Sequence, residues 1–149
     1  MRSNYEKNNA ILAIDFSVTR RARLVVKHLL RSRGATARNE LGEQLLDELC
    51  DCARIDIVYL KIHDARQYHK RRGKRVVMRQ YGYYRPASQS IYITNRTAVR
   101  GQLLAPKTFL TTLLHEWMHH YDHCKLKLNS IHTKGFYLRL GSLTEVLLS

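Results

Sequence analysis

The pattern of apolar and polar positions predicts helices near both ends of the chain and strands in its middle. Apolar residues spaced three and four apart predict helices over residues 17–33 and 36–52. Alternation of apolar with polar residues predicts strands over 54–63, 75–84 and 89–94. Helical spacing returns from residue 105 or 106 to 123 or 124. It returns again after Ser130, a residue type that can cap a helix.

This order of elements predicts an α+β fold in a single domain spanning residues 1–149. We expect a small, mainly antiparallel sheet of about three strands, packed against one central helix with further helices on its flanks. Residues 1–16 combine an Asn-rich polar stretch with a short apolar run, and we expect this segment to be partly loose.

The helix predicted to end near residue 124 contains a candidate metal site. His115-Glu116-Trp117-Met118-His119 matches the pattern His-Glu-x-x-His, in which two histidines one helical turn apart can bind the same zinc ion. Glu116 is then placed to take a proton from a water. Most apolar residues of this helix lie on the opposite side, so we expect the histidines to face a cleft. The apolar residues are Phe109, Leu110, Leu113, Leu114, Trp117, Met118 and Tyr121.

A catalytic zinc ion usually has three protein ligands and one open position, so a third ligand has to come from outside the motif. His123 lies about 12 Å further along the helix axis than His115, and His120 points about 100° away from the motif pair. His63 and His69 lie in a different, basic region. Two residues remain: His132, which follows a polar loop, and Glu145, on the last predicted helix. His132 is favoured, because a histidine at the start of a helix can be placed over the face of a neighbouring helix.

Together these residues resemble the SprT-like (Spartan-type) zinc metallopeptidases. The shared features are His115-Glu116-x-x-His119, followed thirteen residues later by His132-x-x-x-Phe136, and a strand over 90–94 that precedes the motif helix. The second family motif is of His-Gly-x-x-Phe type. Thr133 stands here in place of its glycine, and Gly135 follows two positions later. The resemblance covers residues 81–147, and no zinc ribbon of the kind seen in some family members is expected.

The resemblance implies a zincin-like minimal domain with zinc-dependent endopeptidase activity. In this chain His115, His119 and His132 would hold Zn²⁺, and Glu116 would act as the general base. Spartan-type enzymes cleave proteins that are bound or cross-linked to DNA. The implied partners are therefore a protein substrate and DNA, either single-stranded or containing junctions.

The charge of the chain agrees with a polyanionic partner. The formal net charge is +14 and the isoelectric point is about 10.1, and nucleic acid is the natural partner of so basic a domain. Cations are concentrated between residues 66 and 85, with tyrosines interleaved among them, and they are suited to contact phosphates. The candidate nucleic-acid-binding residues are Lys70, Arg71, Arg72, Lys74 and Arg75.

Three cysteines without metal-site spacing favour reduced thiols and a cytoplasmic protein, free or associated with the nucleoid. The sequence predicts no signal peptide and no membrane partner, and it does not predict an oligomeric state. Two other functions stay open. One is a regulatory zincin of a phage or mobile element that cleaves a free repressor. The other is a non-catalytic, zinc-containing nucleic-acid-binding protein.

Overall fold

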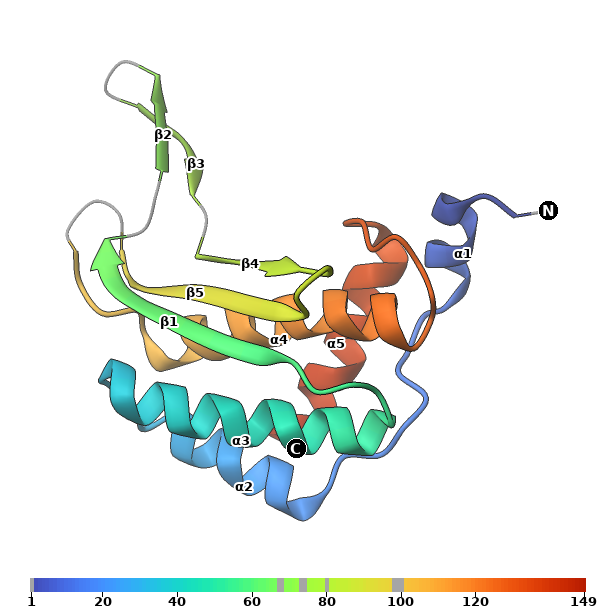
Figure 1. Cartoon of the computed structure of the whole chain (residues 1–149), viewed down its shortest axis with the longest axis horizontal. Helices are drawn as coiled ribbons and strands as arrows, with labels where there is room; N and C mark the ends of the chain where they lie inside the picture. Colours follow the sequence, from blue (N-terminus) through green and yellow to red (C-terminus); the bar gives the residue numbers. More distant parts are fainter. Residues whose placement is uncertain (1, 67–68, 73–74, 80, 98–100) are drawn as a thin grey trace.

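The computed structural model describes residues 2–66, 69–72, 75–79, 81–97 and 101–149 (Figure 1). Five helices and five strands occur in these ranges. In chain order they are α1 (Asn4–Ala10), α2 (Arg20–Leu29), α3 (Ala35–Ala53), β1 (Tyr59–Arg66), β2 (His69–Arg72), β3 (Arg75–Arg79), β4 (Gly82–Arg85), β5 (Ser90–Arg96), α4 (Pro106–Cys124) and α5 (Lys134–Leu148).

The main sheet has three strands in the order β1-β5-β4. The predicted α+β class and strand number are confirmed, but the expectation of a mainly antiparallel sheet is wrong. β5 pairs antiparallel with β4, whereas β1 pairs with β5 in parallel, with Leu60 opposite Ile91. The parallel pair arises because the chain leaves the sheet after β1 and returns on the far side of β5.

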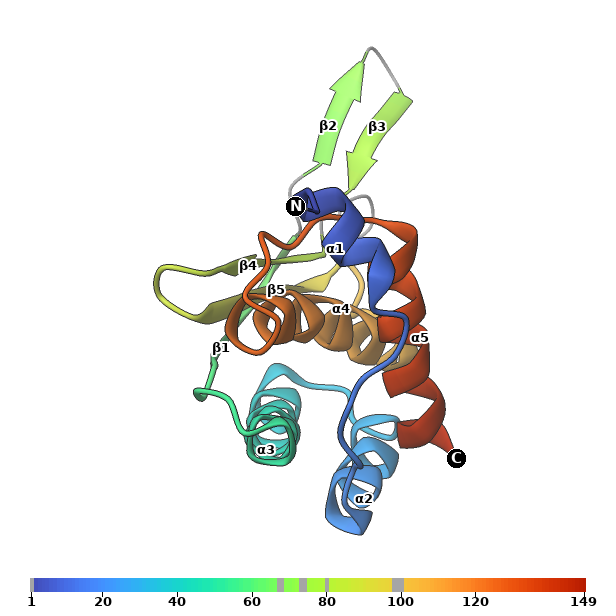
Figure 2. The ribbon, with the colours of Figure 1, turned by 90° about the vertical axis from the view of Figure 1, so that its right-hand side faces the viewer.

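The chain between β1 and β4 forms a separate antiparallel hairpin of β2 and β3, which projects away from the main sheet in both views (Figures 1 and 2). The strand predicted over residues 75–84 is therefore two strands in two sheets. Its first part is β3 in the hairpin, and its last part is β4 at the edge of the main sheet.

The core lies between the main sheet and the helices α3 and α4. Alternate residues of the sheet are buried on this side, among them Leu60, Ile91 and Ile93. The apolar stripe predicted for α4 is confirmed, because each of its seven residues is at most 1% exposed. All three cysteines have free thiols, and buried Cys50 accepts a hydrogen bond from Nε1 of Trp117 at 3.3 Å.

Helix boundaries follow local capping rules. Pro106 occupies the first turn of α4, as predicted, and the Thr19 side chain caps α2. The prediction that Ser130 caps the last helix is wrong. Thr133 takes that role, its hydroxyl accepting a hydrogen bond from the backbone N–H of Phe136 at 3.1 Å. None of the helices in the described ranges is long and apolar enough to cross a membrane.

The N-terminal segment, which we expected to be partly loose, contains helix α1 packed against the start of α5 (Figure 2). The approach is close at Gly135, whose backbone N–H donates to the Asn9 side chain at 2.9 Å. A Cβ atom added at Gly135 would lie 2.1 Å from the carbonyl oxygen of Asn8. A glycine is therefore required where α5 meets α1.

Replacing this glycine should separate the two helices. Gly135→Ala should destabilise the fold by about 1–3 kcal/mol, because the added methyl group meets backbone atoms that cannot rotate away. The matched control is Gly141→Ala in the same helix, where a Cβ meets no atom within 4 Å. This change should stabilise the fold by about 0.5–1 kcal/mol. Urea unfolding measures both, and equal effects of the two substitutions would contradict the close approach.

Candidate metal centre

Three histidine side chains converge on one point. Two come from α4, and the third comes from the segment that links α4 to α5 and turns back along α4 (Figure 1). Nε2 of His132 lies 3.0 Å from Nε2 of His115 and 3.0 Å from Nε2 of His119. One ligand atom from each of the three residues lies within 4.8 Å of the others. The structure therefore brings together the three residues that were predicted as metal ligands.

The geometry and chemistry of this group suit a metal ion. Nitrogen ligands about 2.0–2.1 Å from a tetrahedral metal are roughly 3.3 Å apart, close to the spacings seen here. Three ring nitrogens in such contact repel one another when each presents a lone pair, and a cation between them removes the repulsion. Three imidazoles are also one fewer than the four ligands of a closed structural zinc site. The group can thus hold a metal ion and leave one position open.

The ring orientation of His119 is fixed by a hydrogen-bonded chain behind it. Its Nδ1 lies 2.7 Å from Oγ of Ser130, and this hydroxyl donates to Oδ2 of Asp122 at 2.8 Å. Because the single hydroxyl proton goes to the carboxylate, Oγ has only lone pairs to offer, and Nδ1 must be the donor. The proton of His119 then sits on Nδ1, and Nε2 presents its lone pair to the metal position.

Asp122 is held in turn by Arg139 of α5. Both side chains are fully buried, and they form a salt bridge with an Nη2–Oδ2 distance of 2.8 Å and a second contact from Nε at 3.0 Å. Burial raises the pKa of the Asp122 carboxyl, and its hydrogen bonds to Arg139 and Ser130 act in the opposite direction. Nη1 of Arg139 also donates to the carbonyl oxygens of Asn8 and Ile11. The series of hydrogen bonds that orients His119 therefore extends into the N-terminal segment.

The ring of Phe136 contacts all three imidazoles. It is fully buried, and its ring stacks on His119 with centroids 4.6 Å apart and an interplanar angle of 21°. Its centroid is 5.0 Å from that of His115 and 5.4 Å from that of His132. Phe136, the last residue of the His132-x-x-x-Phe136 motif, is thus an apolar contact that limits movement of the three imidazoles.

We call His115, His119 and His132 the metal group. Glu116 follows His115 in the sequence and is buried, with 7% of its surface exposed. Burial raises the pKa of its carboxyl to about 7, which brings it close to neutral pH. Burial also lowers the pKa of His115 to about 4 and that of His119 to about 3, and neighbouring histidines add to both effects. Neutral imidazoles are the form that binds a metal, and a carboxylate of raised pKa suits a general base.

A cleft of about 770 Å³ opens onto these groups. Its lining includes Glu116 and the three histidines, together with Gly82 and Tyr83 of the edge strand β4. β4 lies close to α4, because a Cβ at Gly82 would be 3.1 Å from Cγ2 of Thr112. The cleft is thus bounded by an extended strand.

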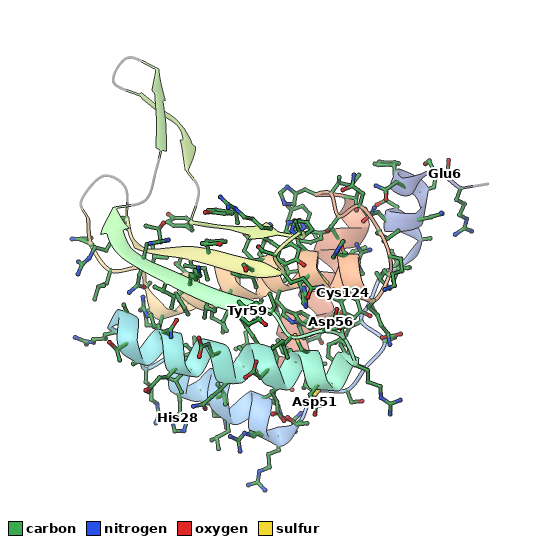
Figure 3. The ribbon with its side chains drawn as sticks, in the orientation of Figure 1. Glu6, His28, Asp51, Asp56, Tyr59 and Cys124 are labelled. Atoms are coloured by element: carbon green, nitrogen blue, oxygen red, sulfur yellow. The ribbon has the colours of Figure 1, made fainter. Side chains whose placement is uncertain are left out.

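The other candidate ligands have different surroundings. Glu145 is exposed on α5 and is outside the metal group. His123 lines the cleft without joining the group. His120 is buried, with its Nδ1 2.7 Å from the hydroxyl of Tyr84 and its Nε2 2.8 Å from the carbonyl oxygen of Asp56. Asp56 and Cys124 mark this region in Figure 3.

Four of the predicted nucleic-acid-binding residues lie in the projecting hairpin, with Lys70, Arg71 and Arg72 in β2 and Arg75 in β3. Lys74 is outside the described residues. The backbone therefore groups four of these residues on one hairpin that stands apart from the metal centre (Figure 1).

Sequence reasoning missed the residues that support the ligands. The capping rule allows both Ser130 and Thr133 as helix caps, so it does not indicate that Ser130 instead contacts a ligand. Asp122 follows His119 by three residues and so lies near it on the helix, a signal that was present in the sequence. Nothing local indicates Arg139, which reaches Asp122 from a different helix.

No protein-family model, curated protein or solved structure matches the chain.

Loss of the third imidazole should abolish tight metal binding. We expect His132→Ala to weaken Zn²⁺ binding by more than the roughly 10–100-fold that loss of an outer-shell partner costs. His123→Ala, a histidine of the same cleft outside the group, should bind as the wild type does. Competition with a chromophoric chelator measures both affinities. Unchanged binding by His132→Ala would contradict the three-histidine site.

The hydroxyl of Ser130 should contribute without touching the metal. Ser130→Ala removes the acceptor for Nδ1 of His119, and metal affinity should fall by about 10–100-fold. Ser130→Thr retains a hydroxyl and should recover most of the loss. Circular dichroism checks that both variants stay folded. Equal affinities of the alanine and threonine variants would show that the hydrogen bond does not orient the ligand.

Proposed function

We propose that the chain is a zinc metallopeptidase of the SprT-like type that hydrolyses peptide bonds in proteins associated with DNA. The observation that carries this proposal is the convergence of His115, His119 and His132 beside buried Glu116 in an open cleft. A ligand set of three imidazoles and a neighbouring carboxylate is the set of parts that metal-assisted hydrolysis needs.

Zinc fits the ligand set, because neutral imidazole is a preferred zinc ligand and the three nitrogens have nearly tetrahedral spacing. When bound, zinc supplies a Lewis acid for a carbonyl oxygen and makes a water more acidic. A structural zinc would need a fourth protein ligand. Within the described ranges the metal group has three members, and both ring nitrogens of His120 are engaged elsewhere.

Glu116 is the proposed general base. Its carboxylate accepts a proton from the attacking water and passes it to the nitrogen of the leaving amine. The pKa of about 7 that burial gives this group allows both transfers near neutral pH. The hydrogen bond to Ser130 holds the proton of His119 on Nδ1. Its Nε2 is therefore the atom that would bind zinc, and the imidazole does not take the proton of the water.

The wall of the cleft favours a peptide over a smaller substrate. Among the described residues, β4 is the edge strand of the main sheet and pairs with β5 on one side only. An extended peptide can pair with the free edge of such a strand through backbone hydrogen bonds. This arrangement would lay a polypeptide along the cleft beside Glu116.

Association of the substrate with DNA is supported by charge. The net charge is +14, and the cations of the β2–β3 hairpin stand apart from the metal centre, where they can contact phosphates without closing the cleft. A cytoplasmic location, free or on the nucleoid, belongs to the same proposal. Cleavage of a free repressor without any DNA would instead favour the regulatory zincin.

The test of the chemistry is removal of the base. Glu116→Gln should retain zinc and lower the rate of proteolysis by about 10²–10⁴-fold, because the amide cannot accept the proton. The control is Glu145→Gln, which makes the same change at an exposed residue of α5 outside the metal group. Both variants are assayed on a casein-type protein and on a DNA-bound protein, with zinc content measured in parallel.

The outcomes separate the alternatives. Zinc retained by both variants with hydrolysis lost only in Glu116→Gln supports the peptidase. Zinc bound by the wild type with no proteolysis on either substrate would overturn it in favour of a non-catalytic zinc protein. Loss of zinc in Glu145→Gln would show that the third ligand has been misassigned.

A further inference from the structure

The main sheet has one face that no described helix covers. Helices α3 and α4 pack on the face that carries Leu60, Ile91 and Ile93, and the side chains that alternate with these point the other way. We call this second surface the open sheet face. It comprises Tyr59, Lys61 and His63 of β1, Tyr92 of β5, and Tyr83 and Arg85 of β4.

Aromatic rings form a row across the open sheet face. Strand register places Lys61, Tyr92 and Tyr83 side by side on β1, β5 and β4. The rings of Tyr83 and Tyr92 stack with centroids 4.8 Å apart, and His63 is nearly parallel to Tyr92 at 6.4 Å. Tyr59, at the start of β1, is 57% exposed (Figure 3). The face thus offers flat, partly exposed rings on all three strands.

Cations surround this row and carboxylates are missing from it. The guanidinium of Arg85 lies 5.3 Å from the Tyr83 centroid and 5.1 Å from that of Tyr92, and the ammonium of Lys61 lies 5.8 Å from Tyr92. Lys61, His63 and Arg85 are exposed. Residues 59–63, 82–85 and 90–96 contain no acidic side chain. Asp64 also belongs to β1, but its side chain is outside those that the structure describes. Among the described side chains, Lys61 and Arg85 form no ion pair.

This combination selects among possible occupants. An apolar protein surface would bury Lys61 and Arg85 without a counter-ion, which is costly. A DNA duplex presents phosphates but keeps its base faces stacked inside. A single strand presents both phosphates for the cations and unstacked bases for the aromatic rings. Exposed aromatic rings with interleaved cations are the general chemistry of single-strand binding.

We propose that the open sheet face binds single-stranded DNA, with bases stacked against Tyr59, Tyr83 and Tyr92 and phosphates held by Lys61 and Arg85. The choice of DNA over RNA rests on the proposed function, whereas the stacking and charge arguments do not. The surface is distinct from the β2–β3 hairpin. Tyr83 also lines the cleft of the metal centre, so a bound strand lies beside the site at which a DNA-held protein would be cut.

The test measures binding of a fluorescent oligo(dT) of roughly 15 nucleotides by anisotropy, a length within the range of known single-strand sites. Tyr92→Leu keeps an apolar side chain on β5 but removes the ring, and affinity should fall by about tenfold. Tyr92→Phe keeps the ring and should bind as the wild type does. Both Tyr92→Leu and Tyr92→Phe place an apolar side chain at this position, and they differ in the aromatic ring. A difference in affinity between them therefore reports the ring.

The charge is tested separately with Lys61→Ala. This variant should weaken binding and reduce the slope of log affinity against log salt by about 0.7, as expected for one lost phosphate contact to a single strand. The control is Lys27→Ala, which removes one exposed lysine from α2 and should leave the slope unchanged. A duplex of the same sequence should bind more weakly and be insensitive to Tyr92→Leu.

Equal affinity of Tyr92→Leu and the wild type for oligo(dT), or equal salt slopes for Lys61→Ala and Lys27→Ala, would overturn the proposal. Tighter binding of oligo(U) than of oligo(dT) would overturn the assignment to DNA. Zinc content of each variant is measured alongside and should match the wild type. Failure of the open sheet face is thereby distinguished from failure of the metal centre.

Discussion

The buried ion pair between Asp122 and Arg139 is the interaction on which the candidate site depends. Neither side chain is exposed, so the charges must satisfy each other inside the protein. Loss of one partner of such a pair typically costs about 3–5 kcal/mol, because the other charge is left buried without compensation. Arg139 uses its remaining donors on the Asn8 and Ile11 carbonyls and the Asn8 side chain. Helices α4 and α5 and the N-terminal segment are therefore held together by one guanidinium.

The same pair explains how His119 is oriented without an excess of negative charge behind the metal position. The Ser130 hydroxyl connects the imidazole to Asp122, and Arg139 balances the carboxylate. An unbalanced carboxylate at this depth would shift toward its protonated form, and it would then no longer accept the hydroxyl proton. The donor and acceptor roles in the hydrogen bonds from His119 through Ser130 to Asp122 thus follow from the charge balance between Asp122 and Arg139.

The parts of the structure that were predicted from the sequence are those set by local periodicity. The spacing of His115 and His119 and the opposed apolar stripe follow from the helical repeat, and α4 has the predicted bounds. The choice between His132 and Glu145 could not be made in this way, because it depends on how the segment after α4 folds back. The parallel pairing of β1 with β5 is equally non-local, and so is the contact of Arg139 with Asp122. The SprT-like resemblance stays a prediction, and it draws on the same local motifs.

The separate hydrogen bonding of the β2–β3 hairpin has a consequence for how such a protein can diversify. In the described residues β2 and β3 pair with each other, and the main sheet is complete without them. A change in the length or charge of the hairpin therefore removes no hydrogen bonds between the strands of the main sheet, which packs against α4. The sequence of this arm can therefore change while the packing of the interior stays the same.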